Sequence, residues 1–331
     1  MLKFIKNLFS KNKPYKIAKT LEYGFLSVGD GHKIYYEIAG NRKGIPVAIL
    51  HGGPGGSIGY SKRAWYNPKE YCIIQFDQRG CGKSTPRLSL ENNTTTALIE
   101  DMEKLRKHLN VDKWVVAGGS WGSTLALAYA VKNSENVLGL FLNSVFLASK
   151  EEMDVVYKNT GPASYIYPDQ YLKFIDPLNQ EERKDPLKAY IKKTNKAKGL
   201  EKEFLLRNFV RWECLLLGLN PDFVSLDRFI NGEDFDAGLA ELELHYFANG
   251  CFMDSEKLLD DLKILKGIPA YIIQGRYDFL CNPKFAYKLH QFLVGSKLVF
   301  TFDGHSIKSY AAKQQAVAFS NEFLQIIKGE R

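Results

Sequence analysis

The sequence predicts an α/β protein with a mostly parallel sheet of eight strands and a large helical insertion. The first observation is a series of short apolar runs rich in β-branched and aromatic residues, which are typical of buried strands. The second is that helical patterns lie between several of these runs, which indicates a parallel sheet covered by helices. The third is that this alternation stops over one long central stretch.

Eight apolar runs are predicted as strands. They lie at 25–29, 33–39, 46–50, 71–76, 113–118, 138–143, 270–275 and 297–302. Between the fourth and fifth runs, apolar residues recur at the spacing of one helix face; these are Leu98, Met102, Leu105 and Leu109. Strands that alternate with such helices form a doubly wound sheet.

These patterns divide the chain into a core and an insertion. Residues 21–147 and 267–331 contain the predicted strands and form the expected core. Residues 148–266 contain helix-like segments, such as 204–217, and no strand of comparable strength. We expect this insertion to form a helical cap domain over the carboxyl ends of the strands, the edge at which open α/β sheets bind ligands.

Residues 1–20 form a basic N-terminal extension. Six of the +8 units of formal net charge come from lysines in this segment, which contains no acidic residue. The rest of the chain therefore carries about +2, a balance that does not favour nucleic-acid binding. An amphipathic helix on a membrane surface is one interpretation of the extension, but a solvated or lightly docked segment is favoured. No stretch approaches the roughly 20 apolar residues of a membrane span, and the extension lacks the apolar core of a secretory signal.

The cysteines and histidines show no metal-ligand spacing. The five cysteines are widely separated without a C-x-x-C pair, and the six histidines are isolated. Structural and catalytic zinc sites usually show closely spaced ligands. We therefore expect no metal or other cofactor, and reduced thiols in a cytoplasmic protein, with Cys72 buried as a small hydrophobic residue.

The stretch "VVAGGSWGS" at 115–123 satisfies the pattern G-x-S-x-G between a predicted strand and a predicted helix. Such a turn lifts the serine hydroxyl off the sheet, and it needs glycines because neighbouring side chains would clash. The N-terminus of the following helix favours negative charge where an oxyanion would form. We predict that Ser120 is a catalytic nucleophile; a serine that merely caps a helix is the alternative.

A serine hydroxyl is a weak nucleophile that needs a base and a group to orient that base. Where a serine stands in such a turn, the acid and the histidine follow it in that order along the chain. Asp278 comes just after the seventh predicted strand and His305 just after the eighth, so both reach the same edge of the sheet. We predict that Ser120, Asp278 and His305 form a catalytic triad.

Other residues compete for the roles of base and acid. The remaining histidines are His32, His51, His108, His245 and His290. His108 and His290 fall in helical patterns, where packing or surface roles are expected. Asp303 lies two residues from His305 on the same loop and is a poorer orienting acid than the predicted one, and Asp254 is the remaining alternative.

The stretch "HGGPGG" at 51–56 follows the third predicted strand, at the place where this arrangement supplies an oxyanion donor. We expect the backbone N–H groups of Gly53 and Trp121 to form the oxyanion hole. Removal of one such donor typically costs about 2.7 to 4 kcal/mol of transition-state stabilisation.

A second glycine-rich stretch, "DQRGCGKST" at 77–85, contains the tripeptide G-K-S of phosphate-binding loops. A phosphate-binding loop would need glycine where Asp77 stands, so the pattern is not satisfied. We interpret the stretch as a structural loop in which Arg79 forms an ion pair.

Together, "HGGPGG", "DQRGCGKSTP", "GGSWGSTLAL", "GRYD" and "GHS" resemble the proline iminopeptidases, which are serine aminopeptidases of the α/β-hydrolase fold. The resemblance runs from about Leu21 to Leu324, and its first three motifs are specific in combination. It implies release of an N-terminal residue, preferentially proline, from peptides with a free N-terminus, through an acyl-enzyme and without a metal. An esterase or small-amide hydrolase with the same triad is the alternative, and the oligomeric state is not predicted.

The resemblance also implies two cap glutamates that bind the substrate amine. One follows a tryptophan in the family and the other precedes "HYF", and the matching residues are Glu213 and Glu243. A carboxylate about 4 Å from an ammonium gains ~4 kcal/mol at an effective dielectric constant near 20 but only ~1 kcal/mol in water, so only a shielded pair would discriminate. Without the resemblance, each glutamate would be interpreted as a solvated helix charge or a salt bridge.

One position departs from the family pattern. Asn143 and Ser144 stand where the family usually has arginine and glycine. In the family that arginine lies near the amine-binding carboxylates, so its replacement implies a change in local charge and in residue preference.

Overall fold

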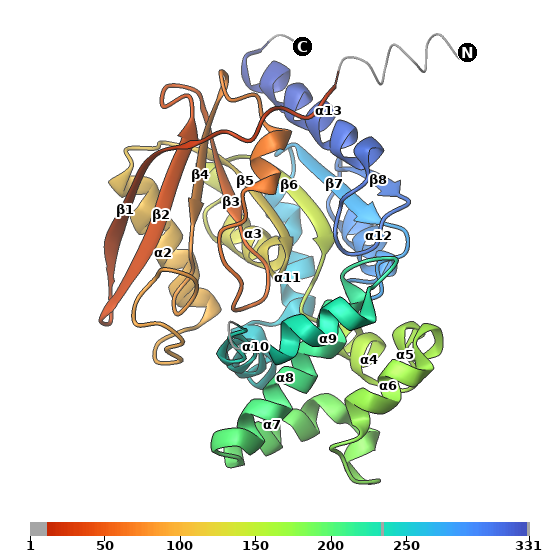
Figure 1. Ribbon diagram of the computed structural model, residues 1–331. Coiled ribbons are helices and arrows are strands. Elements are labelled where there is room, and N and C mark those ends of the chain that lie inside the picture. Colours follow the sequence, from red (N-terminus) through yellow and green to blue (C-terminus); the bar gives the residue numbers. More distant parts are fainter. Residues whose placement is uncertain (1–11, 233–234, 330–331) are drawn as a thin grey trace, which may run out of the picture.

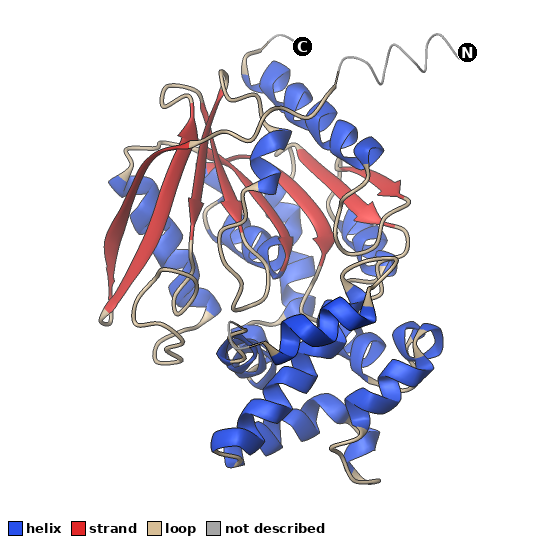
Figure 2. Cartoon of the chain, in the orientation of Figure 1, coloured by secondary structure: helices blue, strands red, loops and turns tan. Residues whose placement is uncertain are grey.

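The computed structural model describes residues 12–232 and 235–329 of the chain. One eight-stranded sheet forms the larger body, and a group of helices lies beside one end of its strands (Figures 1 and 2). The strand order is β1-β2-β4-β3-β5-β6-β7-β8. The two pairs that involve β2 are antiparallel and the other five are parallel, which confirms the predicted fold class.

All eight predicted strands are present. They are β1 (Thr20–Gly29), β2 (His32–Gly40), β3 (Ile45–Leu50), β4 (Tyr71–Phe76), β5 (Trp114–Ser120), β6 (Val137–Val145), β7 (Ala270–Gly275) and β8 (Lys297–Thr301). β1 begins five residues before the predicted run at 25–29, because its first half pairs with the end of β2 at Ala39.

Helices cover both faces of the sheet. They are α2 (Thr95–His108), α3 (Trp121–Lys132), α11 (Ser255–Asp261), α12 (Pro283–Phe292) and α13 (Tyr310–Ile327), with short 3-10 turns η1 (Ser61–Trp65), η2 (Ser134–Asn136) and η5 (Leu262–Leu265). Alternate strand residues face opposite sides. In β5, Val116 packs in the cluster shared with α2, α3 and α12, whereas Val115 packs in the cluster shared with η1 and α13.

A second group of helices occupies the chain between β6 and β7. They are α4 (Lys150–Tyr157), α5 (Pro162–Ile166), α6 (Pro168–Ile175), α7 (Pro186–Lys196), α8 (Gly199–Leu216), α9 (Phe223–Asn231) and α10 (Gly238–Ala248), with η3 (Glu182–Lys184) and η4 (Gly250–Phe252). They enclose an apolar cluster of their own, in which Phe174, Phe209 and Trp212 are central. The group is tied to the end of β8 where the backbone N–H of Ser306 donates to Leu217 O at 2.9 Å.

The limits predicted for the cap domain, 148–266, stay a proposal. α11 and η5 lie within these limits, yet Leu258, Leu259, Leu262 and Leu265 belong to the apolar cluster of the core. Packing therefore favours a cap made of α4 to α10.

The predicted N-terminal extension is described only in part. Residues 1–11, with the suggested membrane-surface helix, lie outside the described residues. Residues 12–19 run along the core, where the Tyr15 N–H donates to Ala64 O at 2.9 Å and the Tyr15 hydroxyl donates to Asn321 Oδ1 at 3.2 Å. In the described part of the chain, no helix has both the length and the apolar character needed to cross a membrane.

Candidate active site

Ser120 occupies a constrained turn between β5 and α3. Its backbone has φ 58° and ψ −134°, a conformation that non-glycine residues rarely adopt and that is typical of functional turns. The surrounding glycines are sterically required: a Cβ on Gly118 would lie 2.0 Å from Gly122 O, and one on Gly122 would lie 2.7 Å from Leu50 O. This packing gives the physical reason for the G-x-S-x-G pattern.

His305 and Asp278 lie side by side after β8 and β7. Nδ1 of His305 is 3.1 Å from Oδ2 and 3.2 Å from Oδ1 of Asp278, and the His305 side chain is 10% exposed. The buried Asp278 carboxylate also accepts hydrogen bonds from the backbone N–H groups of Leu280 and Cys281, at 3.0 and 2.7 Å. Asp278 is thus held in a position from which it orients the imidazole.

Cys281 lies between Ser120 and the pair formed by Asp278 and His305 and contacts the serine. The Ser120 Oγ lies 4.0 Å from the Cys281 Sγ, and the side-chain ligand atoms of Asp278, Cys281 and His305 all lie within 4.8 Å of one another. Within the described residues, no hydrogen bond joins Ser120 to His305. Catalytic hydrogen bonds are often long without substrate and tighten in the complex.

His51 is engaged at both ring nitrogens. The backbone N–H of Gln78 donates to Nε2 at 3.0 Å, so Nδ1 carries the proton and donates to Gly52 O at 2.8 Å. Burial lowers the pKa of His51, which keeps the ring neutral. His51 therefore holds the loop 51–56 in place and is not free to act as a base.

The other competitors also make structural contacts. His32, His108, His245 and His290 form hydrogen bonds with Glu91 O, the Tyr36 hydroxyl, Asn93 O and the Ser296 hydroxyl, respectively. Asp303 accepts hydrogen bonds from the backbone N–H groups of Lys308 and Ser309, and Asp254 caps α11. Neither acid contacts His305 through a hydrogen bond in the structure as described.

The glycine loop after β3 approaches the serine turn. A Cβ on Gly52 would lie 3.2 Å from the Ser120 Cβ, and Gly53 has φ +115° and lines the cavity that contains Ser120. Gln78 links the serine turn to the glycine loop: Nε1 of Trp121 donates to its Oε1 at 2.8 Å, and its Nε2 donates to His51 O at 3.1 Å.

Ser120 shares one small cavity, of about 30 Å³, with both predicted cap glutamates. Glu213 comes from α8 and Glu243 from α10, and the two carboxyl groups are hydrogen-bonded to each other. The hydroxyl of Tyr157, at the end of α4, donates to Glu213 Oε1. The apolar wall of the cavity consists of Phe146, Met153, Val156, Phe247 and Leu280.

The two glutamates share a proton. Burial raises the pKa of Glu213, and burial together with the Glu213 charge raises the pKa of Glu243 well above its ordinary value. Glu243 therefore donates its carboxyl proton to Glu213, whose carboxylate accepts a second hydrogen bond from Tyr157. A buried carboxylate that shares a proton with a second carboxyl group attracts a cation more strongly than a carboxylate in water does.

Several residues of the site were missed by the sequence analysis. Tyr157 and Cys281 carry no recognisable sequence signal. Glu152 also lines the cavity, and burial raises its pKa to about 7. It forms a capping box with Ser149 at the start of α4, so the pattern S-x-x-E could have located it.

Two further expectations can be compared with the geometry. Arg79 forms the predicted ion pair, at 2.7 Å from Asp101 and 3.0 Å from Asp30. Asn143 lies in β6, with its Nδ2 3.2 Å from the Ser144 hydroxyl, and is not among the residues that line the cavity. Asn143 packs against the serine turn, since a Cβ on Gly119 would lie 2.4 Å from its Nδ2, and the expected change in local charge stays a prediction.

One set of potential metal ligands lies close together in the described part of the chain. It consists of Asp278, Cys281 and His305. Burial raises the pKa of the Cys281 thiol well above its ordinary value, which disfavours the thiolate form that binds metals. The contact between Asp278 and His305 is the one by which a triad acid orients its base.

The fold and this serine site define the class of the protein. Residues 45–307 match the family model of the α/β hydrolase fold, so the chain belongs to the α/β hydrolases and is a hydrolase. Among solved structures, it is similar to an esterase from Exiguobacterium antarcticum (TM-score 0.60, 22% identity, 90% of this chain and 98% of that one). A bromoperoxidase from Bacillus anthracis has a TM-score of 0.63 at 18% identity, over 92% of this chain and all of that one. At these identities the likeness shows the fold alone.

Curated relatives place the chain more narrowly, in the proline iminopeptidase family. It is 39% identical to a proline iminopeptidase of Arabidopsis thaliana, over 97% of this chain and 84% of the relative. It is 40% identical to a probable proline iminopeptidase of Leptolyngbya boryana, over 88% of this chain and 91% of the relative. A proline iminopeptidase of Neisseria meningitidis is 39% identical over 81% of this chain and 85% of the relative. These relatives confirm the resemblance found in the sequence motifs.

Proposed function

We propose that this chain is a serine aminopeptidase that releases an N-terminal residue, preferentially proline, from peptides with a free N-terminus. The observation that carries the proposal is the cavity in which Ser120 faces two hydrogen-bonded carboxyl groups. An ester or acyl amide without a cationic amine needs no such pair. The named activity of the relatives supports the same reaction.

In the proposed mechanism, His305 removes the Ser120 proton while the serine oxygen attacks the carbonyl carbon of the N-terminal residue. Asp278 holds the Nδ1–H of the imidazole and stabilises the imidazolium that forms. The N–H groups of Gly53 and Trp121 bind the oxyanion. His305 then gives its proton to the leaving peptide amine, and water, activated by the same imidazole, hydrolyses the acyl-enzyme.

The cap supplies recognition of the amine. Glu213 and Glu243 lie in the same cavity as Ser120, so an ammonium bound to them places the adjacent carbonyl next to the nucleophile. A protonated proline nitrogen has two N–H groups, one for each carboxyl, and its ring would meet the apolar wall that includes Phe146 and Phe247. An internal peptide nitrogen carries no charge and would leave the acids without a cation.

A panel of substrates tests this proposal. Prolyl and alanyl chromogenic amides are compared with their N-acetylated forms and with a simple acyl ester. Because hydrogen bonds to charged groups contribute about 1.5–3 kcal/mol each, acetylation is expected to lower kcat/KM by roughly 100-fold or more. Turnover of the ester alone, or equal turnover of the acetylated amides, would replace the proposal with the esterase or amide hydrolase alternative.

The predictions of a cytoplasmic location, of no cofactor and of no nucleic-acid partner stay predictions. The helices α4 to α10 are proposed to act as the cap, because Glu213, Glu243 and Tyr157 all come from them.

A further inference from the structure

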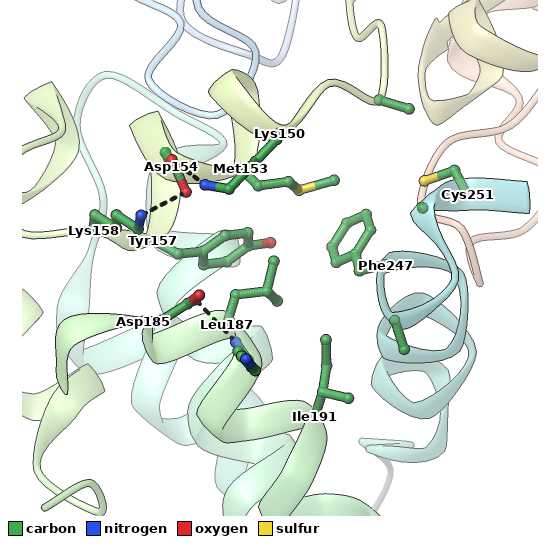
Figure 3. Close-up of a pocket in the computed structure, with 14 residues that line it drawn as sticks. Lys150, Met153, Asp154, Tyr157, Lys158, Asp185, Leu187, Ile191, Phe247 and Cys251 are labelled. Carbon is green, nitrogen blue, oxygen red and sulfur yellow. Dashed lines mark hydrogen bonds and ion pairs between the residues drawn. The ribbon is translucent and has the colours of Figure 1, made fainter. Parts of the chain in front are cut away.

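A second cavity, of about 400 Å³, lies directly behind the wall of the catalytic pocket. It opens between α4, α7 and the end of α10 with the following η4 (Figure 3). Met153, Tyr157 and Phe247 line both cavities, so these three side chains form a shared wall. The two cavities are separate, and these three side chains lie between them.

The interior of the second cavity is apolar. Met153, Tyr157, Leu187, Ile191 and Phe247 point into it (Figure 3). Five charged residues lie at its rim: Asp154 pairs with Lys150 at 2.6 Å and with Lys158 at 3.1 Å, and Asp185 accepts a hydrogen bond from the backbone N–H of Lys188 at 3.3 Å. The interior of the lining therefore offers apolar contact, and its charged side chains are half-buried or exposed at the rim.

The catalytic pocket is smaller than any substrate side chain, so its apolar wall has to yield even for a prolyl ring and further for a long side chain. Its volume of about 30 Å³ corresponds to roughly two water molecules, because one water needs about 10–15 Å³ on the same scale. In the proposed function, Glu213 and Glu243 bind the substrate amine at one side and Ser120 attacks the carbonyl, and all three line this pocket. A side chain that outgrows the pocket therefore has the shared wall in front of it.

Met153 is the part of the wall best able to move. Tyr157 is held by its hydrogen bond to Glu213 and by stacking on Phe209, with ring centroids 5.4 Å apart. Met153 makes neither kind of contact in the structure as described, and an unbranched thioether side chain changes rotamer easily. A shift of Met153 would join the two cavities.

We propose that the second cavity is a side-chain annex of the catalytic pocket, which accepts the distal part of long apolar side chains at the substrate N-terminus. Residues such as norleucine and phenylalanine would pass Met153 and reach Leu187 and Ile191. This inference rests on the proposed aminopeptidase function and extends its substrate class beyond proline. Lysine matches norleucine in length, but its ammonium would have to leave water for an apolar lining.

The wild-type enzyme provides the first test. Aminoacyl amides of proline, alanine, norleucine, lysine and phenylalanine are compared by kcat/KM. The annex predicts that norleucine exceeds both alanine and lysine by roughly tenfold or more, as expected for added apolar contact in a pocket. If proline and alanine amides are cleaved but norleucine is no better than alanine, the annex is wrong while the proposed function stands. Failure to cleave any of the amides would remove the proposed function itself.

Filling the annex provides the second test. Ile191 lies on α7, lines the annex and does not line the catalytic pocket. Ile191→Trp is expected to raise KM for norleucine and phenylalanine amides by roughly tenfold and to change prolyl and alanyl turnover by less than about twofold. Leu172→Trp, at an exposed position of α6, is the matched control and should change none of them. An equal effect of Ile191→Trp on all substrates, or no effect on any, would overturn the proposal.

A variant that opens the wall between the two cavities provides the third test, and its expected effect is opposite to that of Ile191→Trp. Met153→Ala removes the movable part of the wall and is expected to raise the ratio of norleucine to alanine turnover by several-fold. The annex would be contradicted if Met153→Ala left the norleucine-to-alanine ratio unchanged and Ile191→Trp left the KM for norleucine amide unchanged. Because the readout is a ratio within one protein, partial loss of folded enzyme does not affect it.

Discussion

The end of the sheet and the helices that face it contribute to the site in different ways. Ser120 is the last residue of β5, and Asp278 and His305 follow β7 and β8, so the backbone of parallel strands determines their places. Glu213 and Glu243 come from two helices, so their approach depends on how α8 and α10 pack. The proposed reacting groups are placed by sheet register, whereas the proposed recognition groups are placed by side-chain packing.

The two regions also differ in how their acids are satisfied. Asp278 accepts hydrogen bonds from two backbone N–H groups and contacts His305, so its charge is compensated within the protein. Glu213 and Glu243 have each other and the hydroxyl of Tyr157. The hydrogen bonds of Asp278 are therefore satisfied within the protein, while the pair of Glu213 and Glu243 remains suited to bind a cation.

Removal of the proposed nucleophile tests the part of the site that the sheet positions, and it has the largest expected effect. Ser120→Ala should lower kcat on prolyl amide by roughly 10⁴- to 10⁶-fold, because the other triad members cannot act without it. Binding of proline as a competitive ligand should persist, since the glutamates are intact. Ser225→Ala, at an exposed position of α9, serves as the control in steady-state assays. Residual activity above about one per cent would contradict the assignment.

Neutralisation of Glu213 and Glu243 tests the part of the site that the helices position. The double variant Glu213→Gln with Glu243→Gln keeps the shape of the cavity but removes its charge. We expect KM for prolyl amide to rise by roughly 100-fold, with a smaller change in kcat, because a shielded ion pair with the amine contributes a few kcal/mol. Glu241→Gln, on the same helix but paired with Lys202 outside the cavity, is the control. A KM as low as that of wild type would show that the acids do not bind the amine.

Glu152, a buried acid of the helical part of the site, links the site to the pH dependence of the free energy of unfolding. Its pKa is raised to about 7 by burial, so its protonated form stabilises the fold below pH about 4.5 and this contribution is lost as pH rises through about 7. A difference of this size corresponds to about 3 kcal/mol. The free energy of unfolding in urea should therefore fall between pH 5 and 8 in wild type relative to Glu152→Gln. Parallel curves for the two proteins would contradict this expectation.

Tyr157 sharpens the comparison with a smaller effect. Tyr157→Phe removes the hydrogen bond donated to Glu213 and should raise the pKa of that acid further. Since a hydrogen bond to a charged group contributes about 1.5–3 kcal/mol, KM for prolyl amide is expected to rise by roughly tenfold. Tyr165→Phe, at an exposed position of α5, is the matched control. An unchanged KM would mean that Tyr157 only packs in the cap.

The same difference explains what the sequence could predict. All eight strands were located because each is a short apolar run with local boundaries, and the predicted triad residues follow three of them. β1 begins earlier than predicted because Thr20 pairs with Ala39, a contact that no local pattern shows. The α/β-hydrolase fold and the family were predicted and are confirmed.

The helical part of the site was harder to predict. Glu213 and Glu243 were named only through the family resemblance, since helix periodicity alone favoured solvated charges. The contact of Tyr157 with Glu213 joins residues 56 positions apart, and Cys281 meets Ser120 across 161 positions. The annex depends on Met153, Ile191 and Phe247, which belong to three different helices. Such contacts follow from the packing of whole elements and leave no local sequence signal.

The central claim is that loops from β5, β7 and β8 activate one serine hydroxyl. Labelling with a fluorophosphonate, followed by peptide mass spectrometry, tests this claim most directly in wild type, Ser120→Ala, His305→Ala and His290→Ala. We predict a single adduct on Ser120 in wild type and in His290→Ala, no adduct in Ser120→Ala, and labelling slowed by roughly 100-fold or more in His305→Ala. An adduct on another residue, or equal labelling rates in wild type and His305→Ala, would contradict it.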